Sequence, residues 1–211
     1  MAKKTLSQNL WIKRKESDIF FLNAKKKGYG ARSAFKLLEI DKKFNVIKKN
    51  KNYIDLGAAP GSWSQVLVEK ISKNANYKEV KIFSIDIKDI EPISGVITIK
   101  DDISTLIEKN KYFKRNSINL VLSDMAPKST GHRFTDQTKA KSLSKIAFEF
   151  ANNYLSLNGN FVCKLLGGHY DKILILEARK KFKFVQLFKP KSSRNESKEI
   201  FLICMGFNNL Q

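Results

Sequence analysis

Cysteine and histidine are scarce in this sequence, with two residues of each among 211. Cys163 and Cys204 both lie inside apolar runs, FVCKLL and FLICMG, where buried thiols are expected rather than a disulfide or metal ligands. His132 and His169 add no spacing typical of a metal site. The sequence therefore excludes zinc and disulfide chemistry, and we expect a protein without a metal.

Long apolar runs are also missing. No stretch approaches the roughly 18 apolar residues of a membrane-spanning helix, and the start, MAKKTLSQNLWIKRK, lacks the apolar centre of a secretory signal. Hydrophobic residues still make up 42% of the chain, enough for a packed core. We expect a soluble cytoplasmic protein that does not bind membranes. An organelle of bacterial descent stays open, because a basic start is also compatible with a transit peptide.

Acidic side chains are half as frequent as basic ones: 20 Asp and Glu stand against 40 Lys and Arg, a formal charge of +20. Residues 1–50 hold 14 basic and 4 acidic side chains, and residues 178–198 hold 8 and 1, so these two segments carry +17 of the total. Clustered positive charge is typical of a surface that binds a polyanion such as RNA. The alternative, an AT-rich genome that inflates the lysine count, predicts an even spread instead.

Beyond residue 50, short apolar runs alternate with segments of helical periodicity. This pattern is typical of an α/β fold with helices on both faces of a mostly parallel sheet. Helices are expected at 31–44, 62–72 and 137–155. Only Lys189 to Lys198 joins the last two strands, too short for a crossover helix, so these strands should be antiparallel neighbours. Seven strands are expected, at 52–56, 80–86, 96–99, 117–123, 160–166, 183–188 and 199–206.

The chain shows no internal repeat and no proline-rich linker. Residues 1–30 are polar, basic and largely without periodicity, whereas residues 31–211 hold the periodic segments. We therefore expect a basic N-terminal extension followed by a single domain.

The first expected strand ends in DLGAAPGSW, residues 55–63, and passes directly into a helix. Small residues at such a turn let a ligand approach the backbone, and the free N–H groups of the helix start favour an anionic group. The spacing from Gly57 to Gly61 differs from the Gly-x-Gly-x-x-Gly of nicotinamide-dependent oxidoreductases, which disfavours hydride transfer. Asp86 ends the next strand, where a carboxylate can accept hydrogen bonds from ribose hydroxyls or, alternatively, cap the following segment.

Five separated motifs carry a resemblance to a known family. In order, they are RSAFKL at 32–37, DLGAAPGSW at 55–63, SDMAPKSTG at 123–131, FVCKLL at 161–166 and SKEIFLI at 197–203. From about Arg32 to Gly206 the chain resembles the RrmJ/FtsJ family of S-adenosylmethionine-dependent RNA 2′-O-ribose methyltransferases. The resemblance implies a Rossmann-like methyltransferase fold whose seven-stranded sheet has its last strand antiparallel, in agreement with the strands expected above.

The resemblance also implies a catalytic tetrad, which falls on Lys36 of AFKL, Asp124 of SDMAP, Lys164 of VCKLL and Glu199 of SKEIF. From the residues alone, Lys36 could be one more charge on a basic helix, Asp124 a cap, and Glu199 a partner of Lys198. Lys164 fits a purely structural role least, because it interrupts an apolar strand where an unpaired charge is costly. Asp124 and Glu199 are its candidate partners.

A ribose 2′-hydroxyl is a weak acid and a poor nucleophile, so its methylation needs a base or a group that stabilises the developing alkoxide. We expect Lys164 to be the base and Lys36 to support the alkoxide. Asp124 and Glu199 would hold the geometry. The reaction needs no metal, because the sulfonium leaving group departs as a neutral thioether and alignment provides most of the catalysis.

For the cofactor S-adenosylmethionine, the resemblance implies five contact residues. They are Gly61 and Trp63 near the methionine end, Asp86 on the ribose hydroxyls, Asp102 beside the adenine, and Asp124 where cofactor and nucleophile meet. Asp101 is an alternative for the adenine contact. Ser62, often glycine in the family, would narrow the turn and leave its backbone donors available.

The resemblance favours ribosomal RNA within the large ribosomal subunit as the partner, as for family members that methylate a uridine in the A-loop of 23S ribosomal RNA. His132 and Arg133 are expected to face the RNA. Two alternatives stay open: a tRNA anticodon-loop 2′-O-methyltransferase, and a non-catalytic RNA-binding ribosome assembly factor on the same fold. The second is disfavoured, because all four tetrad positions carry the required side chains. We expect a monomer.

Overall fold

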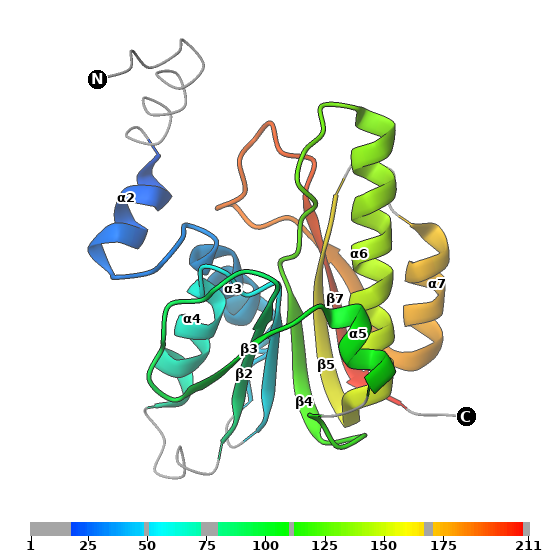
Figure 1. The fold of residues 1–211 in the computed structure, drawn as a ribbon. Coiled ribbons are helices and arrows are strands. Elements are labelled where there is room, and N and C mark those ends of the chain that lie inside the picture. Colours follow the sequence, from blue (N-terminus) through cyan, green and yellow to red (C-terminus); the bar gives the residue numbers. More distant parts are fainter. Residues whose placement is uncertain (1–17, 49–50, 73–79, 110–111, 167–170, 209–211) are drawn as a thin grey trace.

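The computed structural model describes residues 18–48, 51–72, 80–109, 112–166 and 171–208. Its strands form one seven-stranded sheet in the order β3-β2-β1-β4-β5-β7-β6, as Figure 1 shows. The strands are β1 (Tyr53–Leu56), β2 (Ile82–Asp86), β3 (Val96–Lys100), β4 (Ile118–Ser123), β5 (Leu155–Leu165), β6 (Phe182–Phe188) and β7 (Ile200–Phe207). Only β7 runs antiparallel to its neighbours, β5 and β6. The predicted α/β class and the antiparallel closing pair are confirmed.

Helices cover both faces of the sheet (Figure 1). The described helices are α2 (Ile19–Lys26), α3 (Ala34–Phe44), α4 (Ser62–Ile71), α5 (Ile103–Lys109), α6 (Arg133–Tyr154) and α7 (Lys172–Lys181). The apolar side chains of α3 and α4 form one buried cluster with one face, and those of α5, α6 and α7 form another cluster with the opposite face. None of these helices is long and apolar enough to cross a membrane.

Both cysteines are buried on neighbouring strands of the sheet. Cys163 lies on β5 and Cys204 on β7, and these strands pair with each other. Burial raises the pKa of the Cys163 thiol to about 12 and raises that of Cys204 as well. Both thiols are therefore protonated at neutral pH and behave as small apolar side chains.

Strand β5 starts at Leu155, five residues before the predicted start at residue 160. The pair Asn158-Gly159 looks like a helix stop in the sequence, because both residues suit turns. In the structure it lies inside the strand, where the register jumps: Ile118 of β4 pairs with Leu155, but Leu120 pairs with Asn160. The extra residues of β5 form an irregularity of the β-bulge kind, and Asn158 adopts a positive φ of 60° there.

The N-terminal segment contains a helix that its sequence pattern does not predict. Helix α2 buries only Ala24, so it has almost no apolar periodicity to detect. Asp18 caps its start and pairs with Arg32, and the ring of Phe20 lies 5.6 Å from that of Phe35 on α3. This part of the expected extension is therefore packed against the domain. The rest of it, residues 1–17, lies outside the described residues, and the boundary at residue 30 stays a prediction.

Candidate active site

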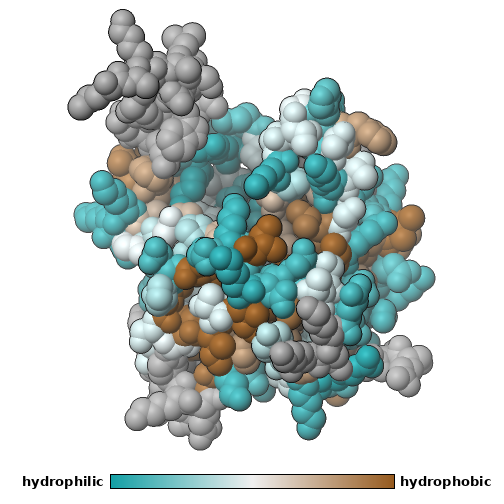
Figure 2. Space-filling view, in the orientation of Figure 1, coloured by the Kyte–Doolittle hydropathy of each residue, from teal (hydrophilic) through white to brown (hydrophobic). Residues whose placement is uncertain are grey.

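The four predicted tetrad residues approach one edge of the sheet from different elements. Asp124 follows β4 and Lys164 lies near the carboxyl end of β5, whereas Glu199 directly precedes β7, which starts at this edge because it runs antiparallel. Lys36 comes from α3, which packs over the same sheet. Figure 1 shows the β4–α6 and β6–β7 connections rising beyond this edge, and Figure 2 shows hydrophilic side chains around a hollow there.

The two lysines each meet one of the two acids. Lys164 Nζ lies 2.9 Å from Asp124 Oδ1 and also donates to the main-chain carbonyl oxygen of Asp124 at 2.6 Å. Lys36 Nζ lies 2.7 and 2.8 Å from the two carboxyl oxygens of Glu199. The side chains of Lys164 and Glu199 are only 8% and 9% exposed. Each buried charge therefore has an opposite charge in contact, as burial of an ion requires.

The two pairs form one electrostatic unit. Burial on its own would raise the pKa of Glu199, but the charge and hydrogen bond of Lys36, with a smaller contribution from the charge of Lys164, hold this pKa below its usual value. Glu199 is therefore ionised at neutral pH, and both ammonium groups act on it. The cluster brings two positive and two negative groups together and is neutral as a whole.

Phe201 connects these groups, although no sequence pattern considered above predicts this role. Its ring centroid lies 5.8 Å from Lys36 Nζ and 5.7 Å from the Trp63 ring, and Phe201 is the register partner of Lys164 across β5 and β7. The signal was available in the SKEIFLI motif, because residues two apart on a strand share a face, which places Phe201 on the same side as Glu199.

A cavity of about 620 Å³ opens beside Asp124, between the ends of β1, β2 and β4 and helix α6. It brings together three of the predicted cofactor residues, Asp86, Asp102 and Asp124, and its wall also includes Asp101. Gly57 forms part of the floor: its φ is +70°, and a Cβ at this position would collide with the side chain of Met125. The glycine therefore keeps the turn close to the β4 end.

The acidic side chains of this cavity also brace the backbone around it. Asp86 accepts hydrogen bonds from the Ala59 and Lys88 N–H groups, both at 2.9 Å. Asp102 Oδ1 accepts from Ser104 N at 2.9 Å, at the start of α5. Because each carboxylate oxygen has two lone pairs, both groups keep capacity to accept a further hydrogen bond from a ligand.

Gly61 and Trp63 do not line this cavity. Gly61 precedes α4 with φ +101°, and the buried Trp63 indole donates from Nε1 to the carbonyl oxygen of Ser33 at 2.8 Å. Ser33 directly precedes α3, so the indole ties the helix after the glycine turn to the helix that carries Lys36. A contact of Gly61 and Trp63 with the cofactor stays a prediction.

Asp55 belongs to the DLGAAPGSW motif, but the motif does not predict a separate role for its side chain. It is 1% exposed in β1, where its Oδ2 accepts from Ser64 Oγ at 2.7 Å. Burial raises its pKa to about 7, and the nearby charges of Asp124 and Asp86 add to this effect, while the Ser64 hydrogen bond opposes it. A carboxyl group that changes charge near neutral pH therefore lies under the glycine turn.

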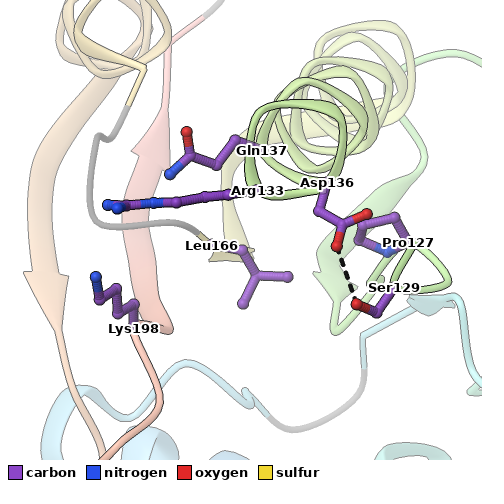
Figure 3. A pocket seen from close by; sticks show the side chains of 7 residues that line it. All are labelled: Pro127, Ser129, Arg133, Asp136, Gln137, Leu166 and Lys198. Atoms are coloured by element: carbon purple, nitrogen blue, oxygen red, sulfur yellow. Dashed lines mark hydrogen bonds between the residues drawn. The ribbon is translucent and has the colours of Figure 1, made fainter. Parts of the chain in front are cut away.

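A second cavity, of about 410 Å³, lies between α6 and the ends of β5 and β7 (Figure 3). Its wall is formed by Pro127, Ser129, Arg133, Asp136, Gln137, Leu166 and Lys198. Asp136 fixes the loop at its rim by accepting hydrogen bonds from Thr130 N at 2.8 Å and Ser129 Oγ at 2.9 Å, and these bonds hold the pKa of Asp136 below its usual value. Arg133, predicted to face RNA, lines this cavity; His132 is exposed at the start of α6.

Within the ranges that the structure describes, no group of three or more His, Cys, Asp or Glu side chains is placed to hold a metal ion.

Residues 29–207 match the protein family described as FtsJ-like methyltransferase. This chain belongs to that family. The FtsJ-like methyltransferase is 41% identical to "Ribosomal RNA large subunit methyltransferase E" of Wolbachia sp. subsp. Brugia malayi (strain TRS), over 97% of this chain and 91% of the relative. It is 42% identical to the protein of the same name from Pelagibacter ubique (strain HTCC1062), over 97% of this chain and 98% of the relative.

Among solved structures, the FtsJ-like methyltransferase is similar to a ribosomal RNA methyltransferase from Plasmodium falciparum, with 30% identity and a TM-score of 0.73. The match covers 85% of this chain and 98% of that chain. The predicted family, the methyltransferase class and the Rossmann-like fold are thus confirmed.

Proposed function

We propose that this FtsJ-like methyltransferase transfers a methyl group from S-adenosylmethionine to a ribose 2′-hydroxyl of large-subunit ribosomal RNA in the cytoplasm. The observation that carries this proposal is the position of the two lysine–carboxylate pairs directly beside the acidic cavity, with Asp124 belonging to both. A site of this kind can bind a cationic cofactor on one side of Asp124 and act on a hydroxyl group on the other.

The acidic cavity fits S-adenosylmethionine in its chemistry. Asp86 and Asp102 offer acceptors for hydroxyl and amino donors, and Asp124 offers a negative charge at the mouth toward the tetrad. When bound, the cofactor supplies an electrophilic methyl group on a positively charged sulfur. Aspartate side chains favour such a ligand over an anionic one, such as a nucleoside phosphate.

In the proposed reaction, the Lys164 ammonium first releases a proton to solvent, and the resulting neutral amine then takes the proton of the 2′-hydroxyl. Asp124 orients its Nζ through the carboxylate and the main-chain carbonyl oxygen. Lys36, held by both oxygens of Glu199, places a positive charge near the oxygen as it becomes an alkoxide. Phe201 keeps Lys36 in position by covering one side of its ammonium group.

The choice of RNA rests on charge and on the relatives. Segments 1–50 and 178–198 carry +17 of the +20 formal charge, which suits a polyanion. The relatives named above carry ribosomal RNA of the large subunit in their names. A uridine as the target follows from the family resemblance of the sequence motifs.

The substrate is tested with methyl-labelled S-adenosylmethionine and, in separate reactions, large ribosomal subunits, free ribosomal RNA and tRNA. We expect label in large-subunit ribosomal RNA, and nuclease digestion should place it on a ribose. Label only in tRNA would overturn the proposed substrate, and no label in any RNA would overturn the proposed activity.

The role of Lys164 is tested by two substitutions. Lys164→Ala should lower the rate of methyl transfer by about 10²- to 10⁴-fold, the range for a positioned acid–base group. Lys164→Arg keeps the positive charge but cannot lose a proton near neutral pH, so it should be nearly as inactive. Cofactor binding, measured by calorimetry, should persist in both. Near-parent turnover in the Lys164→Arg protein would show that Lys164 is not the proton acceptor.

A further inference from the structure

The second cavity lies at the strands that carry Lys164 and follow Glu199, farther along the sheet than the acidic cavity. The acidic cavity spans the ends of β2, β1 and β4, and the second cavity lies over the next strands of the sheet, β5 and β7. Leu166, in its wall, is two residues beyond Lys164, and Lys198 directly precedes Glu199. Pro127 lines both cavities. Asp124 of the tetrad therefore lines the first cavity, and close chain neighbours of Lys164 and Glu199 line the second.

The charge of this second cavity differs from that of the first. Figure 3 shows the charged ends of Arg133 and Lys198 on one side of the cavity, with Pro127 and the Asp136–Ser129 hydrogen bond on the other. Neither cation has an ion-pair partner among the described parts of the chain. Asp136, the one acidic residue among those that line this wall, stays ionised and is hydrogen-bonded to the loop that it fixes, so the wall carries two positive charges against one negative charge. The two cations are therefore available to an anionic ligand.

We propose that the second cavity is the acceptor subsite: it receives one unpaired nucleotide of the RNA, and Arg133 and Lys198 bind the phosphates that flank its ribose. This assignment rests on the proposed function. It deepens that function, because it names the residues that hold the RNA next to Lys164.

The geometry of the reaction supports the subsite. A methyl group is displaced in line, so the attacking hydroxyl must approach from the side opposite the sulfur. With the cofactor in the acidic cavity, that side is the one toward β5 and β7, where the second cavity lies.

The shape and chemistry of the cavity support a single nucleotide rather than a helix. A double-stranded RNA offers its 2′-hydroxyls along a wide, shallow groove, whereas unpaired bases can be splayed out into pockets. A hollow of about 410 Å³ lies within the usual range of small-ligand clefts. The apolar surface of Leu166 and Pro127 suits the face of a base, and the guanidinium of Arg133 suits a phosphate.

The assignment is tested with Arg133→Gln and Lys198→Gln, each against a matched control at the opposite edge of the sheet. Arg115→Gln and Lys114→Gln remove the same charges from exposed residues just before β4. We expect each subsite variant to raise the KM for large ribosomal subunits at least about tenfold, as expected for a lost hydrogen bond between charged groups. Affinity for S-adenosylmethionine should be unchanged.

The salt dependence of RNA binding gives an independent readout. Binding of ribosomal RNA without cofactor should show a log–log salt slope that is flatter by about 0.7 for each subsite variant, the value for one lost phosphate contact with single-stranded RNA, and unchanged for the controls. Equal KM values and slopes in subsite variants and controls would overturn the subsite. Absence of methyl transfer by the unaltered protein would instead refute the proposed function, and the binding slopes would still decide the subsite.

The single-nucleotide requirement is tested on an RNA hairpin that carries the mapped target nucleotide in its loop. Annealing a complementary strand over the loop should abolish methylation, while annealing a strand over a remote single-stranded tail should leave it unchanged. Equal rates on the paired and unpaired loop would contradict the assignment.

Discussion

The buried carboxyl group of Asp55 gives a stability prediction whose sign and size follow from the structure. The unfolded chain loses this proton near pH 3.8, whereas the folded chain keeps it up to about pH 7. Because the folded state binds more protons between these values, the free energy of unfolding contributed by this group falls as the pH rises through that window. The whole shift corresponds to about 4 kcal/mol.

The substitution Asp55→Asn removes this titration and imitates the protonated acid. Its amide oxygen can still accept the hydrogen bond of Ser64. The stability of Asp55→Asn relative to the parent should therefore rise by about 3 kcal/mol between pH 5 and pH 8, since most of the window lies above pH 5. Comparing the two proteins at each pH cancels the titration of all other groups.

Urea denaturation at four pH values between 5 and 8 measures this difference, with circular dichroism and the fluorescence of the buried Trp63 as two signals. Asp89→Asn is the control, because its side chain is 86% exposed and the net charge changes equally. A stability difference that stays constant from pH 5 to pH 8 would refute the reasoning, because it would mean that Asp55 is already ionised at pH 5 in the folded chain.

Two further substitutions test the cofactor contact of Asp86 and the contribution of the Trp63 hydrogen bond to stability. Asp86→Ala should weaken S-adenosylmethionine binding by about 1.5 to 3 kcal/mol, the range for hydrogen bonds of a charged group, as measured by calorimetry; a change below about 0.5 kcal/mol would argue against a ribose contact. Trp63→Phe should lower the free energy of unfolding by about 1 to 3 kcal/mol, because it leaves the Ser33 carbonyl without its partner and opens space beneath α3. Denaturation followed by circular dichroism measures this loss, and unchanged stability would show that the Trp63 bond is dispensable.

The sequence predicts the sheet well where burial is uniform. Strands such as β1 and β4 are apolar runs bounded by turn residues, so the pattern predicts them within a residue or two. The pattern does not predict the first half of strand β5, because a bulge places Asn158 and Gly159 inside the strand, and these residues are typical of turns. The pattern also does not predict helices α2, α5 and α7. These helices are short and bury few side chains, so their apolar periodicity is weak.

For the candidate site, the sequence predicts which residues take part but not how they pair. Lys164 stands out in the sequence, because a charge in an apolar strand needs a partner, and family motifs point to Lys36, Asp124 and Glu199. No pattern in the sequence says which lysine meets which acid, because those pairings depend on how α3 packs over β7 and on the register of β5. The hydrogen bond of the Trp63 indole to Ser33 could not be predicted from the motif, because it depends on how α4 packs against α3; the contact of Trp63 with the cofactor stays a prediction.

The two buried thiols offer a way to measure how often the core around them opens. Cys163 is the chain neighbour of Lys164 on strand β5, and Cys204 lies on β7, the strand paired with it. Both thiols belong to the buried cluster between the sheet and helices α5, α6 and α7, so a thiol reagent reaches them only when this cluster opens. The rate of labelling under native conditions therefore measures how often this part of the core opens. Because Lys164 follows Cys163 on β5, an opening that disturbs this strand would also disturb the pair of Lys164 with Asp124.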